Sequence, residues 1–202
     1  MIGSKVYTDL IDIDKLRAIY KFSKNLSLSD VQALLKAAKS RSFAPQEYLI
    51  EAGSKSRNAY LIRRGLVRTF MITEKGEEIT TMLRWENQIT TNIDSIFFNQ
   101  ASRFYFQALE QTEVLYMDYD LIQTIIAKNP KLEANRKHFL LNLLKEAISR
   151  MDSFVLLNPE ERYLEFIKSN PDIINRVHNK YIANVLGITP VSLSRIRARI
   201  AS

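Results

Sequence analysis

The sequence predicts an α+β protein with three parts in order along the chain: a β domain, a long central helix and a C-terminal pair of short helices. Short strand-like runs broken by turn residues occupy residues 42–117 and suggest a jelly roll or a small barrel. One uninterrupted helical pattern runs from Pro130 to about Leu157, and two short helical patterns then flank Gly187. The expected domain divisions are 1–128, 129–157 and 158–202.

The composition is that of an ordinary folded protein, and it excludes several kinds of metal and redox site. The 202 residues are 46% hydrophobic and 25% charged, with a net charge of +7. Cysteine is absent, which excludes disulfides, thiolate metal sites and iron–sulfur clusters and suits a cytoplasmic location. The N-terminus lacks the apolar run of a signal peptide, and no run of about 18 apolar residues occurs, so neither export nor a membrane span is expected.

Residues with catalytic potential are few. With only His138 and His178, the sequence contains no metal-ligand cluster and no Ser-His-Asp set, and both histidines fall in predicted helices or at their edges. The sequence therefore indicates no catalytic residue, no metal site and no enzyme.

The elements of the first part follow from a change of period. Helices are expected over residues 8–40, where apolar residues recur at helical spacing. Strands follow, with a hairpin turn at residues 73–77. The predicted strands cover residues 42–46, 48–50, 60–62, 66–72, 79–85, 104–109 and 112–117. Residues 118–120 then cap a short helix.

The central helix carries two adjoining apolar stripes. One steps by four and three residues, as in a coiled-coil seam, and comprises Leu140, Leu144, Ala147, Met151 and Phe154. The other comprises Leu141, Ile148 and Val155. Because two stripes need two partners, we expect one to pack on the β domain and the other to pair with the same helix of a second chain, which makes a homodimer. The alternative is one helix buried in a monomer.

The C-terminal segment is basic and is patterned as two helices. Residues 176–202 contain five basic residues and no acidic one. Asn179 is expected to cap the first helix, and Gly187 to end it by adopting the left-handed conformation. Thr189 then caps the second helix, with Pro190 at its first position.

The second helix has an apolar and a polar face. Leu193, Ile196 and Ile200 form the apolar stripe. The opposite face comprises Val191, Ser194, Arg195 and Ala198, with Ser192 and Arg199 beside them. This is the sequence pattern of a helix-turn-helix, whose second helix enters the major groove of DNA. The alternative is an ordinary helical hairpin with a solvated basic face, which the absence of carboxylates disfavours.

Two stretches of sequence and the order of the parts point to a family. The stretches are Tyr60-Leu61-Ile62-(x)2-Gly65-Leu66-Val67-Arg68 and Ile182-Ala183-(x)3-Gly187-Ile188-Thr189-Pro190-(x)2-Leu193-Ser194-Arg195-Ile196. Together they resemble the Crp/Fnr family of bacterial transcription regulators. The resemblance implies a cyclic-nucleotide-binding-like double-stranded β-helix, a dimerising central helix and a C-terminal winged helix-turn-helix that binds near-palindromic promoter DNA. Its expected partners are double-stranded DNA, a second copy of the chain and RNA polymerase, with no membrane.

The resemblance also suggests which residues meet DNA. In the family, the first positions of the second helix and an arginine on its second turn read bases, and here these are Pro190, Val191 and Arg195. Arg195 can donate two hydrogen bonds to a guanine, and Val191 can pack on a thymine methyl. The other residues expected at DNA are Lys180, Thr189, Ser192, Ser194, Arg197 and Arg199, mainly as phosphate contacts. Too few residues follow Ile196 for a wing, so any β-hairpin is expected earlier, within residues 172–177.

The region that matches the family's effector pocket departs from the family's pattern. Members that bind cyclic nucleotides carry Gly-Glu and, later, Arg-Ser/Thr-Ala. This chain has no glycine between Gly76 and Gly187, and Arg103 lies one residue beyond the matching place. The residues expected nearest the pocket are Thr90, Thr91, Asn92, Ser102 and Arg103.

We therefore expect that cyclic AMP does not bind in the family's way, and no cofactor is assigned. Three alternatives stay open: the pocket is empty, is collapsed on aromatic side chains, or takes another small-molecule effector. The main functional hypothesis is a homodimeric, DNA-binding transcription regulator with a degenerate effector domain. The second is a ligand-sensing module that acts through protein contacts rather than DNA.

Overall fold

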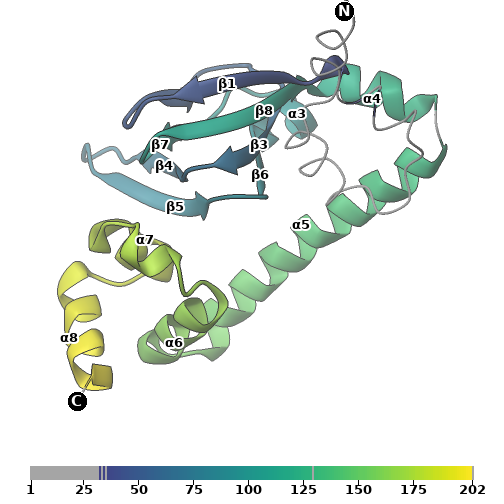
Figure 1. The fold of residues 1–202 in the computed structure, drawn as a ribbon. Helices are drawn as coiled ribbons and strands as arrows, with labels where there is room; N and C mark the ends of the chain where they lie inside the picture. The colour runs from purple at the N-terminus through teal and green to yellow at the C-terminus, as the bar shows by residue number, and fades with distance from the viewer. Residues whose placement is uncertain (1–31, 33, 35, 129, 202) are drawn as a thin grey trace, which may run out of the picture.

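The fold is given by a computed structural model that describes residues 32, 34, 36–128 and 130–201. Figure 1 shows a β domain, a long helix that runs away from it, and a group of short helices that returns beneath the domain. Most of the helical pattern predicted over residues 8–40 lies outside the described residues, and the first strand begins at Lys39, inside that range.

The β domain contains eight strands among the described residues. They are β1 (Lys39–Phe43), β2 (Tyr48–Ile50), β3 (Asn58–Arg64), β4 (Val67–Ile72), β5 (Glu78–Arg84), β6 (Ile89–Thr91), β7 (Tyr105–Ala108) and β8 (Thr112–Asp118). They form two antiparallel sheets, of order β1-β8-β3-β6 and β2-β7-β4-β5. The domain core takes side chains from both sheets, including Phe43, Tyr60, Val67 and Phe106, and therefore lies between them.

The strand predictions from residue 48 onward overlap strands of the structure, apart from one segment, whereas the strand predicted at residues 42–46 is displaced, because β1 ends at Phe43 and residues 45–46 form a turn. The β4–β5 hairpin turns at residues 73–77, as predicted, with Thr73 N–H donating to the Glu77 carbonyl. The sequence analysis missed β6 and the helix that follows it, α3 (Ile93–Phe98). The reason is local: Asn92 accepts a hydrogen bond from Ser95 N–H and starts α3 directly after a strand of three residues, which is too short for a period to emerge.

Helix caps fix the second half of the chain. Asp118 caps α4 (Tyr119–Ala127), as predicted. The long helix α5 spans Pro130–Leu156, within a residue of its predicted end. Asn158 then begins α6 (Pro159–Ser169) with a capping box, in which Asn158 and Glu161 satisfy each other's backbone N–H groups.

The segment after α6 is helical, not a hairpin. The β-hairpin expected within residues 172–177 is wrong, because Ile173–Asn175 form a short 3-10 helix, η1. In this turn Ile173 and Val177 are buried, which anchors the segment to the core. Two apolar side chains four residues apart lie on the same side of one helical turn, and Val177 N–H donates to the Ile173 carbonyl to close that turn.

The last two helices are α7 (Asn179–Leu186) and α8 (Pro190–Ala201). His178, not Asn179, caps α7, since its Nδ1 accepts from Lys180 N–H. Gly187 ends α7 with φ +66, and a Cβ there would lie 2.6 Å from the Phe154 ring of α5, so both conformation and space require glycine. Thr189 Oγ1 accepts from Ser192 N–H and caps α8, as predicted.

One hydrophobic core joins the β domain to the C-terminal helices. Leu66 and Leu83 of the β domain are buried in the same cluster as Ile182, Leu186 and Leu193. Figure 1 shows α7 directly beneath β5. The contact is also polar, since Thr80 N–H donates to Asn184 Oδ1 at 3.1 Å.

Two arginines reinforce this junction. Arg176, beside η1, donates to both carboxylate oxygens of Glu86 at 2.9 and 2.8 Å, and it also pairs with Glu110. Arg68 of β4 is 2% exposed, pairs with Glu78 at 2.7 Å, and lies over the Tyr181 ring of α7 at 4.4 Å. The C-terminal helices are thus held against the β domain by charged and aromatic contacts as well as apolar ones.

Glu86 is itself fixed by the β domain. It accepts from Gly65 N–H at 2.8 Å, and Gly65 has φ +106 with the backbone of Thr112 only 2.6 Å from where a Cβ would stand. Burial raises the pKa of Glu86, but the hydrogen bonds from Arg176 and Gly65 outweigh it and leave that pKa below its ordinary value. Glu86 is therefore a preformed anionic anchor for Arg176.

The apolar stripes of α5 face outward. One of the two stripes was expected to pack on the β domain. Leu141, Ile148 and Val155 of one stripe are exposed, and so are Leu144 and Met151 of the other. The middle of α5 meets the rest of the chain through polar groups: Glu146 pairs with Arg84 of β5 at 2.7 Å, and Arg150 donates to the Val185 carbonyl. The expectation that one stripe packs on the β domain is wrong, because ion pairing takes that side of the helix.

Candidate nucleic-acid interface and ligand corner

The outward face of α8 carries the residues that the sequence assigned to bases. Val191 is 60% exposed, and Ser194 and Arg195 are exposed beside it. The opposite face is held by Leu193 and Ile196, which are 0% and 5% exposed. Ile200, predicted to face inward with them, is 40% exposed, because α8 extends past the core in its last turn.

The start of α8 is also exposed. Thr189 and Pro190 are exposed, and the Thr189 and Ser192 hydroxyls lie 2.9 Å apart. Lys180, in the first turn of α7, is exposed as well. Hydroxyl and ammonium groups such as these are common donors to phosphate oxygens. Together these groups form a surface that suits contact with a nucleic-acid backbone, with Glu160 of α6 as the carboxylate that borders it beside Ser192 and Arg195.

Two arginines predicted to meet phosphates have partners inside the protein. Arg197 is half-buried and donates to Tyr163 Oη at 3.1 Å and to Asn179 Oδ1 at 2.6 Å, which ties α8 to α6 and α7. Arg199 pairs with Glu160 of α6 at 2.9 Å. The sequence suggested phosphate contacts for both, but it contained no signal for these partners, which lie on other helices.

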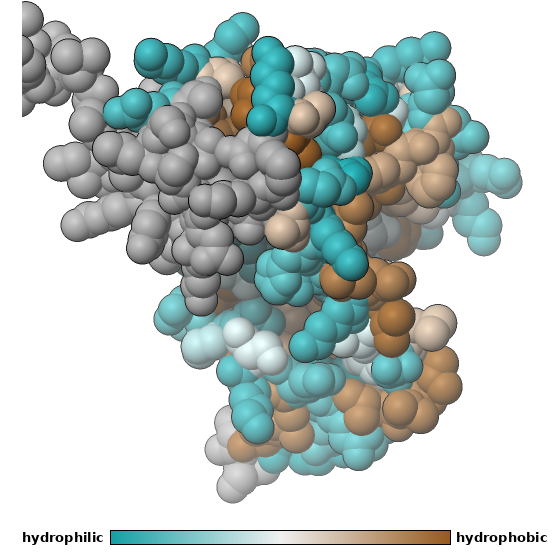
Figure 2. Space-filling model, turned by 90° about the vertical axis from the view of Figure 1, so that its right-hand side faces the viewer, coloured by the Kyte–Doolittle hydropathy of each residue, from teal (hydrophilic) through white to brown (hydrophobic). Residues whose placement is uncertain are grey.

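The residues predicted for the dimer seam lie along one side of α5. Leu144, Met151 and Phe154 are 56%, 59% and 42% exposed, Ala147 is exposed and Leu140 is half-buried. Figure 2, which views the side where α4 and α5 lie in Figure 1, shows hydrophobic side chains reaching the surface in the middle and lower part of the molecule. Phe154 also supports the turn between α7 and α8 through its contact with Gly187.

The corner of the β domain beside α3 contains a tight ion pair. Asp94, in the first turn of α3, accepts from Arg103 Nε at 3.1 Å, from its NH2 at 2.9 Å and from its backbone N–H at 3.0 Å. The Asp94 side chain is only 5% exposed. The hydrogen bonds from the Arg103 side chain hold the pKa of Asp94 below its ordinary value. The guanidinium predicted to meet a ligand is thus paired with an internal carboxylate.

The other residues predicted for the effector pocket serve the fold. Asn92 is 1% exposed, caps α3 and donates to the carbonyls of Ser54 and Ser56. Ser102 Oγ donates to the Phe104 carbonyl at 2.8 Å. Thr91 Oγ1 donates to the Asn58 carbonyl at 2.9 Å, and Thr90 is buried in β6.

Aromatic side chains occupy the space between the sheets. Phe43 and Tyr60 meet edge to face at 6.5 Å, and Tyr60 stacks on Tyr116 at 5.8 Å. Phe106 is buried in the same core.

Within the described residues, no group of three or more His, Cys, Asp or Glu side chains could hold a metal ion. No described helix is both long enough and apolar enough to cross a membrane.

The chain is similar in sequence to a known domain family and to bacterial regulatory proteins. Residues 40–129 match the family model of the cyclic nucleotide-binding domain. The anaerobic regulatory protein of Pasteurella multocida is 27% identical over 165 residues, which cover 76% of this chain and 60% of that protein. The fumarate and nitrate reduction regulatory protein of Vibrio cholerae is 27% identical over 166 residues, which cover 75% and 64%. These similarities support a Crp/Fnr family regulator. The resemblance predicted from its two sequence stretches is confirmed.

Solved structures of Crp/Fnr type share the fold of this chain. A mutant of CooA from Carboxydothermus hydrogenoformans has a TM-score of 0.67 at 20% identity, over 92% of this chain and 84% of that one. FixK2 from Bradyrhizobium japonicum has a TM-score of 0.71 at 14% identity, over 81% and 84%. The chain spans less than two thirds of the length of the curated relatives named above.

Proposed function

We propose that this Crp/Fnr chain is a homodimeric, DNA-binding transcription regulator that recognises a near-palindromic promoter site. The observation that carries the proposal is the division of α8 into a buried face and an exposed one. Leu193 and Ile196 fix the helix in the core, while Val191 and Arg195 are left on the surface. A helix held this way can present its outer face to the major groove as a rigid reader of base edges.

Charge supports the same assignment. No acidic residue occurs in residues 176–202, so that segment does not itself repel a phosphate backbone. Lys180, Thr189 and Ser192 would position the protein on phosphates, whereas Arg195 would select a guanine. Arg197 and Arg199, which have internal partners, would contribute less to DNA contact than the sequence suggested.

The exposed stripes of α5 support a dimer. Seven large hydrophobic residues of α5 are exposed in the single chain: Leu141, Leu144, Ile148, Met151, Phe154, Val155 and Leu156. An apolar surface of this kind is costly in water and marks an interaction site. Pairing through the coiled-coil spacing of Leu144 and Met151 would set two α8 helices at the fixed separation that a two-fold operator needs.

The proposed effector domain is degenerate toward cyclic AMP. A cyclic phosphate at the corner beside α3 would approach the Asp94 carboxylate, which already takes the hydrogen bonds of Arg103. The phosphate and the Asp94 carboxylate are both negatively charged and would repel each other. The space between the sheets holds Tyr60, Phe106 and Tyr116. The residues present therefore do not suit the phosphate of a cyclic nucleotide.

The test of the DNA-binding proposal is selection of genomic fragments by the purified protein, followed by fluorescence anisotropy on the selected duplex at several salt concentrations. We expect a near-palindromic motif and an affinity that falls linearly in log–log form as salt rises, because phosphate contacts release counterions. The Leu144→Glu/Met151→Glu variant should be monomeric by light scattering and lose the palindromic preference.

The alternative function, a ligand-sensing module acting through protein contacts, predicts the opposite result in the DNA-binding experiment. The C-terminal helices would then show no salt-dependent binding to duplex DNA. For the effector, thermal unfolding in millimolar cyclic AMP is the direct measurement. A saturable rise of several degrees would contradict the degenerate assignment, since a ligand that binds only the folded state must raise its stability.

A further inference from the structure

The β domain has a hollow that lies outside the space between its two sheets. Its volume is about 250 Å³, and among the described residues it is bounded by the sheet of β3, β6 and β8, by α3 and α4, by the beginning of α5, and by Leu34 and Ala38 ahead of β1. On β3, Ala59 and Leu61 line it, whereas Tyr60 and Ile62 belong to the inner core. Because successive strand residues point to opposite faces, this hollow lies on the other side of the sheet from the inner core, and Thr91 is the one residue it shares with those expected nearest the effector pocket.

The lining is apolar apart from a few groups. Leu61, Leu115 and Met117 form the floor on the sheet, and Phe97 and Phe139 line it from α3 and α5. A lining of this kind offers water too few partners, and an engineered apolar cavity of roughly 150 Å³ binds benzene in preference to water. The larger hollow here accommodates a substituted aromatic ring or a similar compact apolar molecule.

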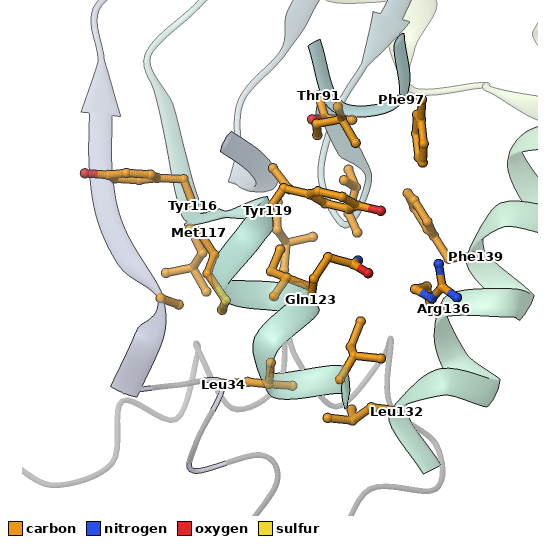
Figure 3. A pocket seen from close by; sticks show the side chains of 18 residues that line it. Leu34, Thr91, Phe97, Tyr116, Met117, Tyr119, Gln123, Leu132, Arg136 and Phe139 are labelled. Atoms are coloured by element: carbon orange, nitrogen blue, oxygen red, sulfur yellow. The ribbon is translucent and has the colours of Figure 1, made fainter. Parts of the chain in front are cut away.

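One polar group in the hollow lacks a partner. The amide nitrogen of Gln123, on α4, is buried and makes no hydrogen bond. Figure 3 shows the Gln123 amide reaching into the pocket, with Tyr119, Arg136 and Phe139 around it. A buried N–H donor without an acceptor is destabilising, so it favours any occupant that brings one.

Charge at the rim argues against an anion. Arg136 lines the hollow, but its Nε donates to Glu133 Oε2 at 2.8 Å one turn earlier in α5, and a second hydrogen bond joins the same pair. The two charges neutralise each other locally. The matching ligand is therefore uncharged and carries a single acceptor.

We propose that this hollow is a binding site for a small, uncharged, mainly apolar molecule with one carbonyl-type acceptor, which accepts a hydrogen bond from Gln123. Leu132, Arg136 and Phe139 carry the site onto the first turns of α5. Since α5 also bears the exposed stripes, an occupant would bias the position of the helix that we assign to dimerisation. That last step rests on the proposed function, whereas the binding site does not.

Acetophenone and α-methylstyrene make a matched pair of probes, because the second has a CH₂ group where the first has the carbonyl oxygen. Calorimetric titration of the full chain should give saturable binding of both, with acetophenone about tenfold tighter, as expected for satisfying one buried donor. Gln123→Leu should abolish that preference and keep α-methylstyrene binding. Ala59→Phe, which fills the hollow, should abolish binding of both probes.

The outcomes separate cleanly. Absence of saturable binding to the wild-type chain would overturn the site, and so would binding that Ala59→Phe leaves unchanged. A tenfold preference that survives Gln123→Leu would overturn the role of Gln123. Should Ala59→Phe not fold, a crystal structure of the wild-type chain grown with acetophenone must put the ring between Ala59 and Phe139, and any other position contradicts the proposal. DNA anisotropy on the same proteins is scored separately, so failure of the ligand site and failure of DNA binding are distinguishable.

Discussion

Arg103, at the corner beside α3, and Arg195, on α8, differ in what surrounds them. Arg103 gives three hydrogen bonds to Asp94, a carboxylate that the protein buries for it. Arg195 is exposed on a face shared with Val191, Ser194 and Ala198, which carry no charge. The sequence assigned both arginines to ligands on similar grounds. The difference teaches that a cation hydrogen-bonded to a carboxylate of the fold is less available to a ligand, and spacing along one element does not reveal such pairing.

The strongest way to break the contrast is to remove what holds α8 in place. Leu193→Ala should lower the free energy of unfolding by about 2–5 kcal/mol, because a fully buried leucine leaves a cavity when truncated. Val191→Ala on the exposed face is the matched control and should change it by less than about 0.5 kcal/mol. Urea unfolding of both variants checks this, and equal losses would mean that α8 is not oriented as described.

A sharper contrast lies between two arginines of the same helix. Arg195→Ala should keep the fold and reduce discrimination at one base pair of each half-site by about 1–3 kcal/mol. Arg197→Ala should instead lower stability, since it removes the hydrogen bonds to Tyr163 and Asn179. Binding-site selection and thermal unfolding on both variants give the comparison. An unchanged selected motif for Arg195→Ala would contradict its role.

Removing the internal anion tests the other side of the contrast. Asp94→Ala should reduce stability by on the order of 1 kcal/mol, because the backbone N–H of Arg103 loses its acceptor. It also releases the Arg103 side chain, so weak phosphate binding should appear that the wild-type chain lacks. Titration with inorganic phosphate, followed by thermal unfolding, measures the gain. Equal responses of the two proteins would show that Asp94 does not exclude anions.

The smallest expected effect is the loss at low pH of the stability that the Asp94–Arg103 pair contributes. Since Arg103 lowers the folded-state pKa of Asp94, the unfolded chain binds a proton first as pH falls. The stabilisation is present above the unfolded value of about 3.9 and is lost as pH falls through the folded pKa. The stability advantage of the wild-type chain over Asp94→Asn should therefore be constant near neutrality and shrink below about pH 4. Thermal unfolding across that range provides the measurement.

Local signals account for the elements that the sequence analysis placed well. Gly187, Thr189 and Pro190 define the turn between α7 and α8 through conformations that each residue favours by itself. Asn158 and Glu161 begin α6 in the same way. The cap of α7 is His178, one residue before the predicted Asn179, and histidine is a rarer capping residue than asparagine.

The candidate sites depended on contacts that no local pattern contains. Arg176 looked like part of a basic tail, yet it binds Glu86, which is 90 positions away along the chain. The Gln123 donor and the hollow around it became visible only when α3, α4, α5 and the sheet were assembled. Pairing between distant residues is set by how elements pack, and periodicity within an element carries no information about it.

The sequence by itself determined which segments form helices and strands in most of the described chain, which face of α8 is apolar, and that the C-terminal segment is basic. Propensities, caps and periodicity act over a few residues, so they can be read directly from neighbours in the chain. Tertiary structure alone decided that Asp94 neutralises Arg103, that ion pairs turn the polar side of α5 toward the β domain, and that one core joins that domain to α7 and α8. These depend on charges and apolar surfaces brought together from distant positions, whose energies exist only once the chain has folded.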